Sequence, residues 1–147
     1  MEMIEWDGSL LLGVEDMDSD HHDLVVCFND LSIANFTGED VAVVSVILQK
    51  LVDHTREHFR HEEALMRRYA YPNIDSHKQE HETLLFSVLM FQQRALEADK
   101  HPISGRNLMF LASWLLNHIM EADKVFARFI LQARVASAAC DSDLQAA

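Results

Sequence analysis

The sequence predicts an all-α, up-down-up-down four-helix bundle with an extended N-terminal arm. Turn-forming residues are too scarce for a many-stranded fold, because the 147 residues include only 4 Gly and 2 Pro. Four stretches carry apolar residues at helical spacing, and short connections separate them. We therefore expect one bundle domain over residues 1–135, followed by a flexible C-terminal tail or the start of a linker over residues 136–147.

The first quarter of the chain is expected to form an arm and one helix. Residues 1–17 alternate apolar and acidic groups without a helical period, so we expect an extended arm that packs over the domain with Trp6 as its anchor. Asp18 has the side chain of an N-cap, which predicts a helix over about 19–36. The Thr37-Gly38 pair is expected to end this helix.

Three longer helices follow. Residues 37–40 resemble a capping box and predict a second helix over about 40–69. A Tyr-Pro-Asn turn separates it from a third helix over about 74–99, which His101-Pro102 stops. The fourth begins at Ser104-Gly105 and runs to about Arg134. Its inward row is Leu108, Leu111, Leu115, His118, Ala122, Val125 and Phe129.

Polar side chains occupy positions in these rows where a bundle would carry leucine. A lone histidine on an apolar face is usually an ordinary hydrogen-bonded core residue, but five on facing helices need a compensating partner. An unpaired buried polar group costs several kcal/mol, and a domain stable by roughly 5 to 15 kcal/mol cannot absorb a whole set of them. A bound cation removes this cost. The side chains are His21, His58, Glu62, His77, His81 and His118.

Their spacing supports a metal site. His58/Glu62 and His77/His81 are i, i+4 pairs, which place both members of a pair on one helix face. Asp123 is less regular, because it follows the last histidine of the set by five residues, about 140° round a helix. Alone it would pass as a solvated charge. A bridging position between two metals, or a local bulge in the helix, would bring it into the site.

Seven protein ligands exceed what one ion needs, so two metal ions are implied. Nitrogen-rich ligation with two carboxylates suits iron, zinc or manganese, and spacing alone does not choose among them. Carboxylates shared between two ions would hold the ions a few ångströms apart.

Four motifs carry a resemblance to a known family. They are D-x-x-H-x-x-L-x-x-x-x-N over residues 18–29, H-F-x-x-E-E-x-L-M over 58–66, H-x-x-x-H over 77–81 after a Tyr-Pro pair, and W-L-x-x-H-I-x-x-x-D over 114–123. In this order and with these spacings the chain resembles the hemerythrin family, and specifically its bacterial branch. The resemblance extends from Trp6 to about residue 130 and includes all seven ligand positions.

The resemblance implies a di-iron centre with a bridging oxo or hydroxo group, and dioxygen as its ligand. One iron would be bound by His77, His81 and His118, and the other by His21 and His58, with Glu62 and Asp123 bridging both. The second iron is then one ligand short, and dioxygen would bind at that vacancy. The fold that the resemblance implies is the same four-helix bundle.

Residues next to the ligands are expected to shape the site. Apolar side chains that flank ligand positions would wall an oxygen pocket and exclude water, or would simply fill the core; they are Phe59, Trp114, Ile119 and Met120. We expect the remaining histidines to be solvated or to contact ligands; they are His22, His54, His61 and His101. Glu63 is expected at the surface or beside a ligand. Ala70 stands at a turn where relatives often have glycine.

Charge and cysteine content limit the partners and the compartment. The 24 acidic and 12 basic residues give a net charge of -12, which repels phosphate backbones and anionic lipid, so we expect no nucleic-acid partner and no membrane insertion. No run of 18 apolar residues and no signal sequence is present. Cys27 and Cys140 lack C-x-x-C spacing, which fits a reducing, cytoplasmic compartment.

Three functions remain open at this point. The favoured one is reversible dioxygen binding for carriage, storage or sensing. The second is an oxygen or redox sensor domain that regulates a fused or partner signalling domain, with the tail after Arg134 as a linker. The third is enzymatic handling of peroxide, nitric oxide or iron at the open position. We expect no enzyme, because the sequence contains no positioned general acid, nucleophile elbow or phosphate loop.

Overall fold

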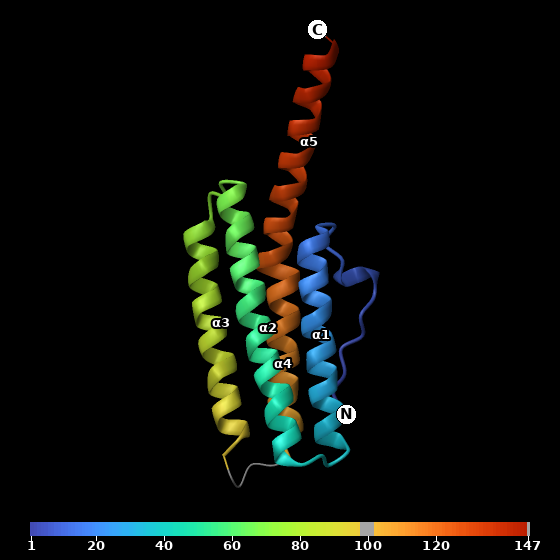
Figure 1. The fold of residues 1–147 in the computed structure, drawn as a ribbon, viewed down its shortest axis with the longest axis vertical. Helices are drawn as coiled ribbons and strands as arrows, with labels where there is room; N and C mark the ends of the chain where they lie inside the picture. Colours follow the sequence, from blue (N-terminus) through green and yellow to red (C-terminus); the bar gives the residue numbers. More distant parts are fainter. Residues whose placement is uncertain (98–101, 147) are drawn as a thin grey trace.

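The expected all-α bundle with an N-terminal arm is confirmed. The computed structural model describes residues 1–97 and 102–146, with side chains up to residue 141, and contains no strand in that part of the chain. Successive helices run in opposite directions (Figure 1). They are α1 (Glu15–Phe36), α2 (Val41–Arg68), α3 (Ile74–Ala95), and a last rod made of α4 (Gly105–His118), the π-helical segment η2 (Ile119–Asp123) and α5 (Lys124–Ala146).

The N-terminal arm lies along α1, but Trp6 is not its main anchor. Ile4 is buried, and both of its backbone polar groups pair with the side chain of Asn29, the N–H donating at 2.8 Å and the C=O accepting at 2.9 Å. Leu10 is buried as well. Trp6 is only half-buried and packs its ring against His22, with ring centroids 5.1 Å apart.

Asp18 does not cap α1. The helix begins at Glu15, and Asp18 lies within its first turns. Its carboxylate instead accepts hydrogen bonds from the backbone N–H groups of Leu12 and Gly13, at 2.8 and 3.1 Å. The capping type of side chain is therefore present, but it fastens the incoming arm to the helix rather than starting the helix.

The connection from α1 to α2 closes the first helix and does not form the expected capping box. The Thr37 hydroxyl donates to the carbonyl of Ile33, and Gly38 adopts a left-handed φ of +74°. Asp40 precedes α2 without a side-chain cap hydrogen bond. Residues 37–40 are thus explained by the end of α1, where glycine meets the left-handed conformation without strain.

α2 ends as α1 does, with one residue in the left-handed conformation after the last helical turn. In α2 this residue is alanine instead of glycine. The N–H groups of Ala70 and Tyr71 donate to the carbonyls of Arg67 and Met66, at 3.2 and 2.9 Å, which is the hydrogen-bond pair of a Schellman motif. Ala70 takes the left-handed φ of +50° that this motif needs. The turn carries the Tyr71 ring to within 6.4 Å of the His77 ring, centroid to centroid.

In the connection from α3 to α4, the end of α3 differs from the prediction, whereas the start of α4 agrees with it. α3 ends at Ala95, earlier than the expected residue 99, and His101 lies outside the described residues. α4 begins as predicted, because Ser104 is its N-cap and accepts a hydrogen bond from the Asn107 N–H at 3.2 Å.

The last rod departs from regular helical spacing after His118. The π-helical segment η2 inserts an extra residue, so the inward positions after it move on by one. Val125 was expected inside but is 54% exposed, whereas Phe126 and Ile130 are fully buried. The prediction of Val125 as an inward residue is wrong because it extrapolated an unbroken α-helical period through the bulge.

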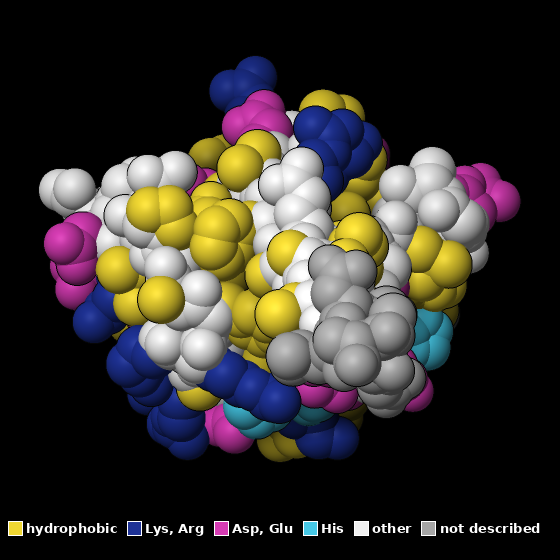
Figure 2. All heavy atoms as spheres, turned by 90° about the horizontal axis from the view of Figure 1, so that it is seen from above, with side chains coloured by type: hydrophobic (Ala, Val, Ile, Leu, Met, Phe, Trp, Pro, Cys, Tyr) yellow, Lys and Arg dark blue, Asp and Glu magenta, His cyan; other side chains and the backbone are white. Residues whose placement is uncertain are grey.

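The rod does not end near Arg134 but continues as α5 to Ala146 and projects beyond the bundle (Figure 1). At its base, Arg134 donates to the Tyr69 hydroxyl at 3.1 Å, and the Arg68 guanidinium lies 5.8 Å from the Tyr69 ring centroid. Viewed from this end, Lys and Arg side chains are prominent in spite of the net charge of -12 (Figure 2). Among the described residues, no helix has the length and apolarity that a bilayer span would require.

Two apolar clusters form the core, and the polar side chains lie between them. On α1, Met17 belongs to one cluster and Leu24 to the other. Along the last rod, Leu115 belongs to the same cluster as Leu24, and Phe126 belongs to the same cluster as Met17. The polar centre is therefore closed at both ends by packed side chains, so water has no open path along the bundle axis.

Candidate metal centre

The seven side chains predicted as ligands converge on the middle of the bundle. They come from all four helical rods, and none is more than 4% exposed. Their nitrogen and oxygen atoms form two overlapping groups, in each of which one atom per residue lies within 4.8 Å of the others. One group is Glu62, His77, His81, His118 and Asp123, and the other is His21, His58, Glu62 and Asp123.

Glu62 belongs to both groups and turns one carboxylate oxygen toward each. Its Oε2 is 2.7 Å from Nε2 of His58. Its Oε1 is 2.7 Å from Nε2 of His77 and 3.6 Å from Nε2 of His81. A carboxylate placed in this way has the arrangement of a bridge between two neighbouring cation sites.

Asp123 also directs one carboxylate oxygen at each group of histidines. Its Oδ2 is 2.8 Å from Nε2 of His21 and 3.3 Å from Nε2 of His58. Its Oδ1 is 3.2 Å from Nε2 of His77 and 3.1 Å from Nε2 of His118. Both acidic residues therefore divide their oxygens between the same two sets of histidines.

The π-helical segment brings Asp123 to this position. In a regular helix the fifth residue after His118 would lie about 140° round the axis, on a different face. A π-helical turn forms i→i+5 hydrogen bonds and so brings residues five apart over one another. Asp123 is fully buried as a result. The local bulge, one of the two ways in which Asp123 could enter the site, is present.

Several of the donor atoms have no hydrogen-bond partner in the described part of the protein. Both oxygens of Glu62 and Nε2 of His81 and His118 are buried without a hydrogen-bond partner among the described residues. Each such atom costs about 1–3 kcal/mol if nothing else satisfies it. Two ligands about 2.1 Å from one ion and at right angles are roughly 3 Å apart, close to the nitrogen–oxygen separations seen here. The residues therefore fit metal ions, and their imidazoles and carboxylates suit iron, zinc or manganese.

Comparison with known proteins agrees with this geometry. Residues 12–130 match the family model of the hemerythrin HHE cation binding domain. The chain belongs to the hemerythrin family.

Relatives and solved structures cover most of this hemerythrin chain. Bacteriohemerythrin of Stenotrophomonas maltophilia is 31% identical over 127 residues, which cover 86% of this chain and 81% of the relative. Myohemerythrin of Theromyzon tessulatum is 31% identical over 122 residues, or 83% and 89% of the two chains. A crystal structure of wild-type hemerythrin is 25% identical, with a TM-score of 0.75 over 86% of this chain and 97% of that one.

An outer layer of carboxylates contacts the histidines of this hemerythrin domain. Three histidines direct Nδ1 at a carboxylate oxygen 3.4 Å away, and such contacts fix the orientation of an imidazole. The pairs are His58–Asp20, His81–Glu63 and His118–Glu80. Each acid is the sequence neighbour of one predicted ligand but contacts a histidine on the next helix.

Sequence reasoning missed two members of this outer layer. Asp20 and Glu80 were not expected near the site, whereas Glu63 was expected at the surface or beside a ligand. The three acids share one signal, since each adjoins a predicted ligand in the sequence. The contacts cross from one helix to another, so spacing within a helix does not reveal them.

The buried acids and histidines of the site change one another's pKa values. Burial lowers the pKa of His77, but its hydrogen bond to Asp123 and its contact with Glu62 outweigh this and raise the pKa to about 9. The pKa of His58 is likewise well above its usual value, because burial is outweighed by the charge of Glu62 and by hydrogen bonds to acids. Burial and Asp123 act to raise the pKa of Glu62, but the neighbouring histidines lower it to about 2.

Of the four apolar residues expected around the ligands, Phe59 and Trp114 place their rings against ligand histidines. The Phe59 ring stacks on the His81 ring with centroids 3.9 Å apart and planes 8° apart. The Trp114 ring is nearly parallel to the His118 ring at 6.5 Å. Ile119 is fully buried and Met120 half-buried. These side chains put apolar surface beside the histidines, which keeps bulk water away from them.

The other described histidines lie at the surface. His61 is half-exposed, with its ring nitrogens 3.0 Å from Asp20 and 3.0 Å from Glu57. His22 and His54 are exposed. His54 is one turn before His58 on α2 and points out of the bundle, which agrees with the choice of His58 over His54 as the ligand.

Proposed function

We propose that this chain binds dioxygen reversibly at a carboxylate-bridged di-iron centre, for oxygen carriage, storage or sensing. One iron would be held by His77, His81 and His118, the other by His21 and His58, with Glu62, Asp123 and an oxo or hydroxo group as bridges. The observation that carries the proposal is the division of the Glu62 and Asp123 oxygens between the two histidine sets. The names of the relatives, bacteriohemerythrin and myohemerythrin, support the same reading.

The two histidine sets are unequal, and this inequality supports a binding role. With the shared carboxylates included, one group offers five residues and the other four. The set of His21 and His58 therefore leaves room for an external ligand. Bound iron would supply the electrons that dioxygen takes up on binding. The surrounding protein would keep the position dry, through Phe59 and Ile119, and would hold the imidazoles in place through Asp20 and its counterparts.

Iron content and optical spectra test the proposal. Protein loaded anaerobically with ferrous iron should bind two ions per chain, gain visible absorption in air and lose it on deoxygenation. Glu62→Ala and His118→Ala should bring iron well below two per chain. The exposed neighbours on α2 provide matched controls, His54→Ala and Glu57→Ala, which should keep two ions. Two tightly bound ions in the Glu62→Ala or His118→Ala protein would refute the ligand assignment. Sustained turnover of peroxide or nitric oxide would replace the binding function by an enzymatic one.

A second candidate is an oxygen or redox sensor that acts on a fused or partner signalling domain. The observation that favours it is the unbroken rod from Asp123 through α5 to Ala146, which extends beyond the bundle (Figure 1). A change in the position of the proposed ligand Asp123 would be transmitted directly to this helix.

A fluorophore on the exposed Cys140, in a Cys27→Ala background, should change anisotropy when oxygen binds if the rod transmits the change. A fluorophore on Glu82→Cys in a chain without Cys140 is the control and should not respond. An unchanged Cys140 signal would favour the carrier.

The proposed compartment is the cytoplasm. Both thiols are free, and their pattern fits a reducing environment.

A further inference from the structure

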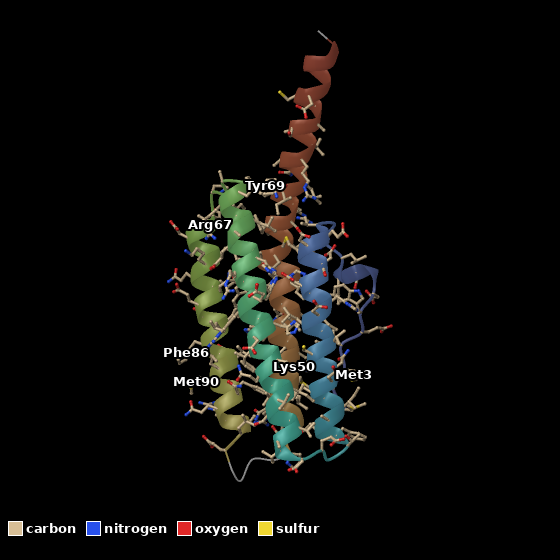
Figure 3. The ribbon with its side chains drawn as sticks, viewed as in Figure 1. Met3, Lys50, Arg67, Tyr69, Phe86 and Met90 are labelled. Atoms are coloured by element: carbon tan, nitrogen blue, oxygen red, sulfur yellow. The ribbon has the colours of Figure 1, made fainter. Side chains whose placement is uncertain are left out.

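A cavity lies between α3 and α4, toward the end of the bundle that is opposite the projecting part of α5. Its volume is about 620 Å³, within the range of small-molecule sites. Phe86 and Met90 line it from α3, on the side of that helix that faces away from α2 (Figure 3), and Phe110 lines it from α4. None of the seven proposed metal ligands lines this cavity, so it is separate from the candidate metal centre.

The apolar part of the cavity is unusually open to solvent. Phe86 is 66% exposed and Phe110 is 55% exposed, although both are large aromatic side chains. Single exposed apolar residues are ordinary, but here two aromatic rings and the half-buried Met90 share one concave surface. This surface can bury the apolar body of a ligand.

The charged side chains that line the cavity are all positive. Its charged lining residues are two arginines, Arg94 and Arg106, in a chain with twice as many acidic as basic residues. Neither arginine forms an ion pair within the part of the chain that the structure describes. Arg94 lies in the last turn of α3, where the helix dipole favours a cation. Arg106 lies in the first turn of α4, where the dipole disfavours one, so helix stability does not account for it.

We propose that this cavity binds a free fatty carboxylate. The carboxylate would pair with Arg94 and Arg106, whose planar guanidinium groups match it in charge and shape, and the alkyl chain would cover Phe86, Met90 and Phe110. Charge complementarity selects this occupant. The net charge of -12 repels anions from most of the surface, while an anion between the arginines relieves their mutual repulsion. The neighbouring Asn107 adds a neutral hydrogen-bonding side chain to the same wall.

Calorimetric titration of the full, iron-loaded chain with monomeric decanoate and dodecanoate tests the proposal. We expect one molecule per chain, and a dissociation constant that falls by roughly two- to fourfold for each added CH₂ that becomes buried. Dodecanol, which has the same chain and no charge, should bind at least tenfold more weakly. Iron content should stay the same, because the cavity does not include the ligands.

Matched variants locate the binding. Removing both arginines, with Arg94→Gln and Arg106→Gln together, should weaken dodecanoate binding at least tenfold. The control removes two exposed cations from α2, with Arg56→Gln and Arg60→Gln together, and should leave binding unchanged although the net charge is the same. Phe86→Ser should weaken dodecanoate and dodecanol alike. All five side chains are exposed, and circular dichroism should report the same fold for each variant.

Several results would overturn the proposal. Equal affinity for dodecanoate and dodecanol would remove the role of the arginines, and equal binding by the two double variants would move the site elsewhere. Binding to vesicles of anionic phospholipid, with no binding of free dodecanoate, would make the surface a membrane contact. A concentration-dependent dimer in sedimentation that Phe86→Ser abolishes, without dodecanoate binding, would make it an interface between two copies of the chain.

Discussion

Metal uptake by this protein should release protons, and the metal-free bundle should lose stability as the pH rises from neutral to 9. Both effects come from His77, whose pKa in the metal-free fold is raised from 6.5 to about 9 by Asp123 and Glu62 against the effect of burial. A ligand imidazole must be neutral, so metal has to displace this proton. Because pH 7 lies about two units below this pKa, removal of the His77 proton should lower the apparent metal affinity about 100-fold.

The stability effect has a definite sign. A raised pKa in the folded state means that the folded protein holds a proton that the unfolded chain has lost, so the contribution is complete below pH 6.5 and disappears as the pH rises through 9. For His77 it amounts to about 3 kcal/mol, from 2.5 pKa units at about 1.4 kcal/mol each. Glu62 acts at the other end, because its pKa is lowered to about 2 and its contribution disappears as the pH falls from 4.5. The metal-free bundle should therefore be most stable between about pH 4.5 and 6.5.

Two measurements check this prediction. Anaerobic calorimetry of ferrous iron binding at pH 7, in two buffers with different ionisation enthalpies, should give at least one proton released per chain. His58, whose pKa is also raised, and water that becomes a bridging hydroxide would add to this number. Urea unfolding of the metal-free protein between pH 6 and 9 should give a falling free energy of unfolding. His54→Ala, which removes an exposed imidazole from the same helix as His58, should change neither result. Metal uptake without proton release, or stability that rises toward pH 9, would refute the reasoning.

Two further predictions concern the scaffold. Ala70→Gly should raise the free energy of unfolding by about 0.5–1 kcal/mol, because glycine relieves a left-handed strain of about 1–2 kcal/mol but gains about 0.4–1 kcal/mol of entropy in the unfolded chain. Gly38→Ala should lower it by a similar amount, and a urea titration in which both changes have the same sign would contradict this account. Phe126→Ala should cost about 3–5 kcal/mol and Val125→Ala less than about 0.5 kcal/mol, measured the same way; similar costs would mean that the register after the bulge is wrong.

The fold and two pairs of the proposed ligands could be predicted because both follow a simple helical period. Asp123 breaks that period, and it was placed among the ligands by the resemblance of the four motifs to the hemerythrin family. His58 and Glu62 are four residues apart on one helix, and so are His77 and His81, so helical geometry alone places each pair. The inward apolar row of α4, from Leu108 to Leu115, follows the same rule. Nothing about the neighbouring helices is needed to predict that the two members of each pair share one helix face.

The errors arise where contacts between segments decide the structure. Asp18 has the chemistry of a helix cap, but the arm supplies the N–H groups that its carboxylate binds, and the helix starts four residues before the expected residue 19. Thr37 was expected both to end α1 and to open a capping box for α2, and only its role at the end of α1 is confirmed. Asp20 and Glu80 contact histidines on other helices, which no spacing within one helix can reveal. A side chain's type predicts that it will make a hydrogen bond, but the tertiary fold selects the partner.

The bulge after His118 connects the proposed site to the core in a way that does not require metal. With regular helical spacing, Val125 would turn inward, and Phe126 and Ile130 would lose burial. Full burial of each large apolar side chain contributes about 1.5–3 kcal/mol, so the regular register would forgo several kcal/mol for Phe126 and Ile130 and recover only the burial of a valine. That difference is large enough to offset a distorted helical turn. Packing of α5 therefore holds the bulge in place, and with it Asp123, before any ion binds. In the proposed centre, Asp123 would therefore be in position as the second shared carboxylate before metal binds.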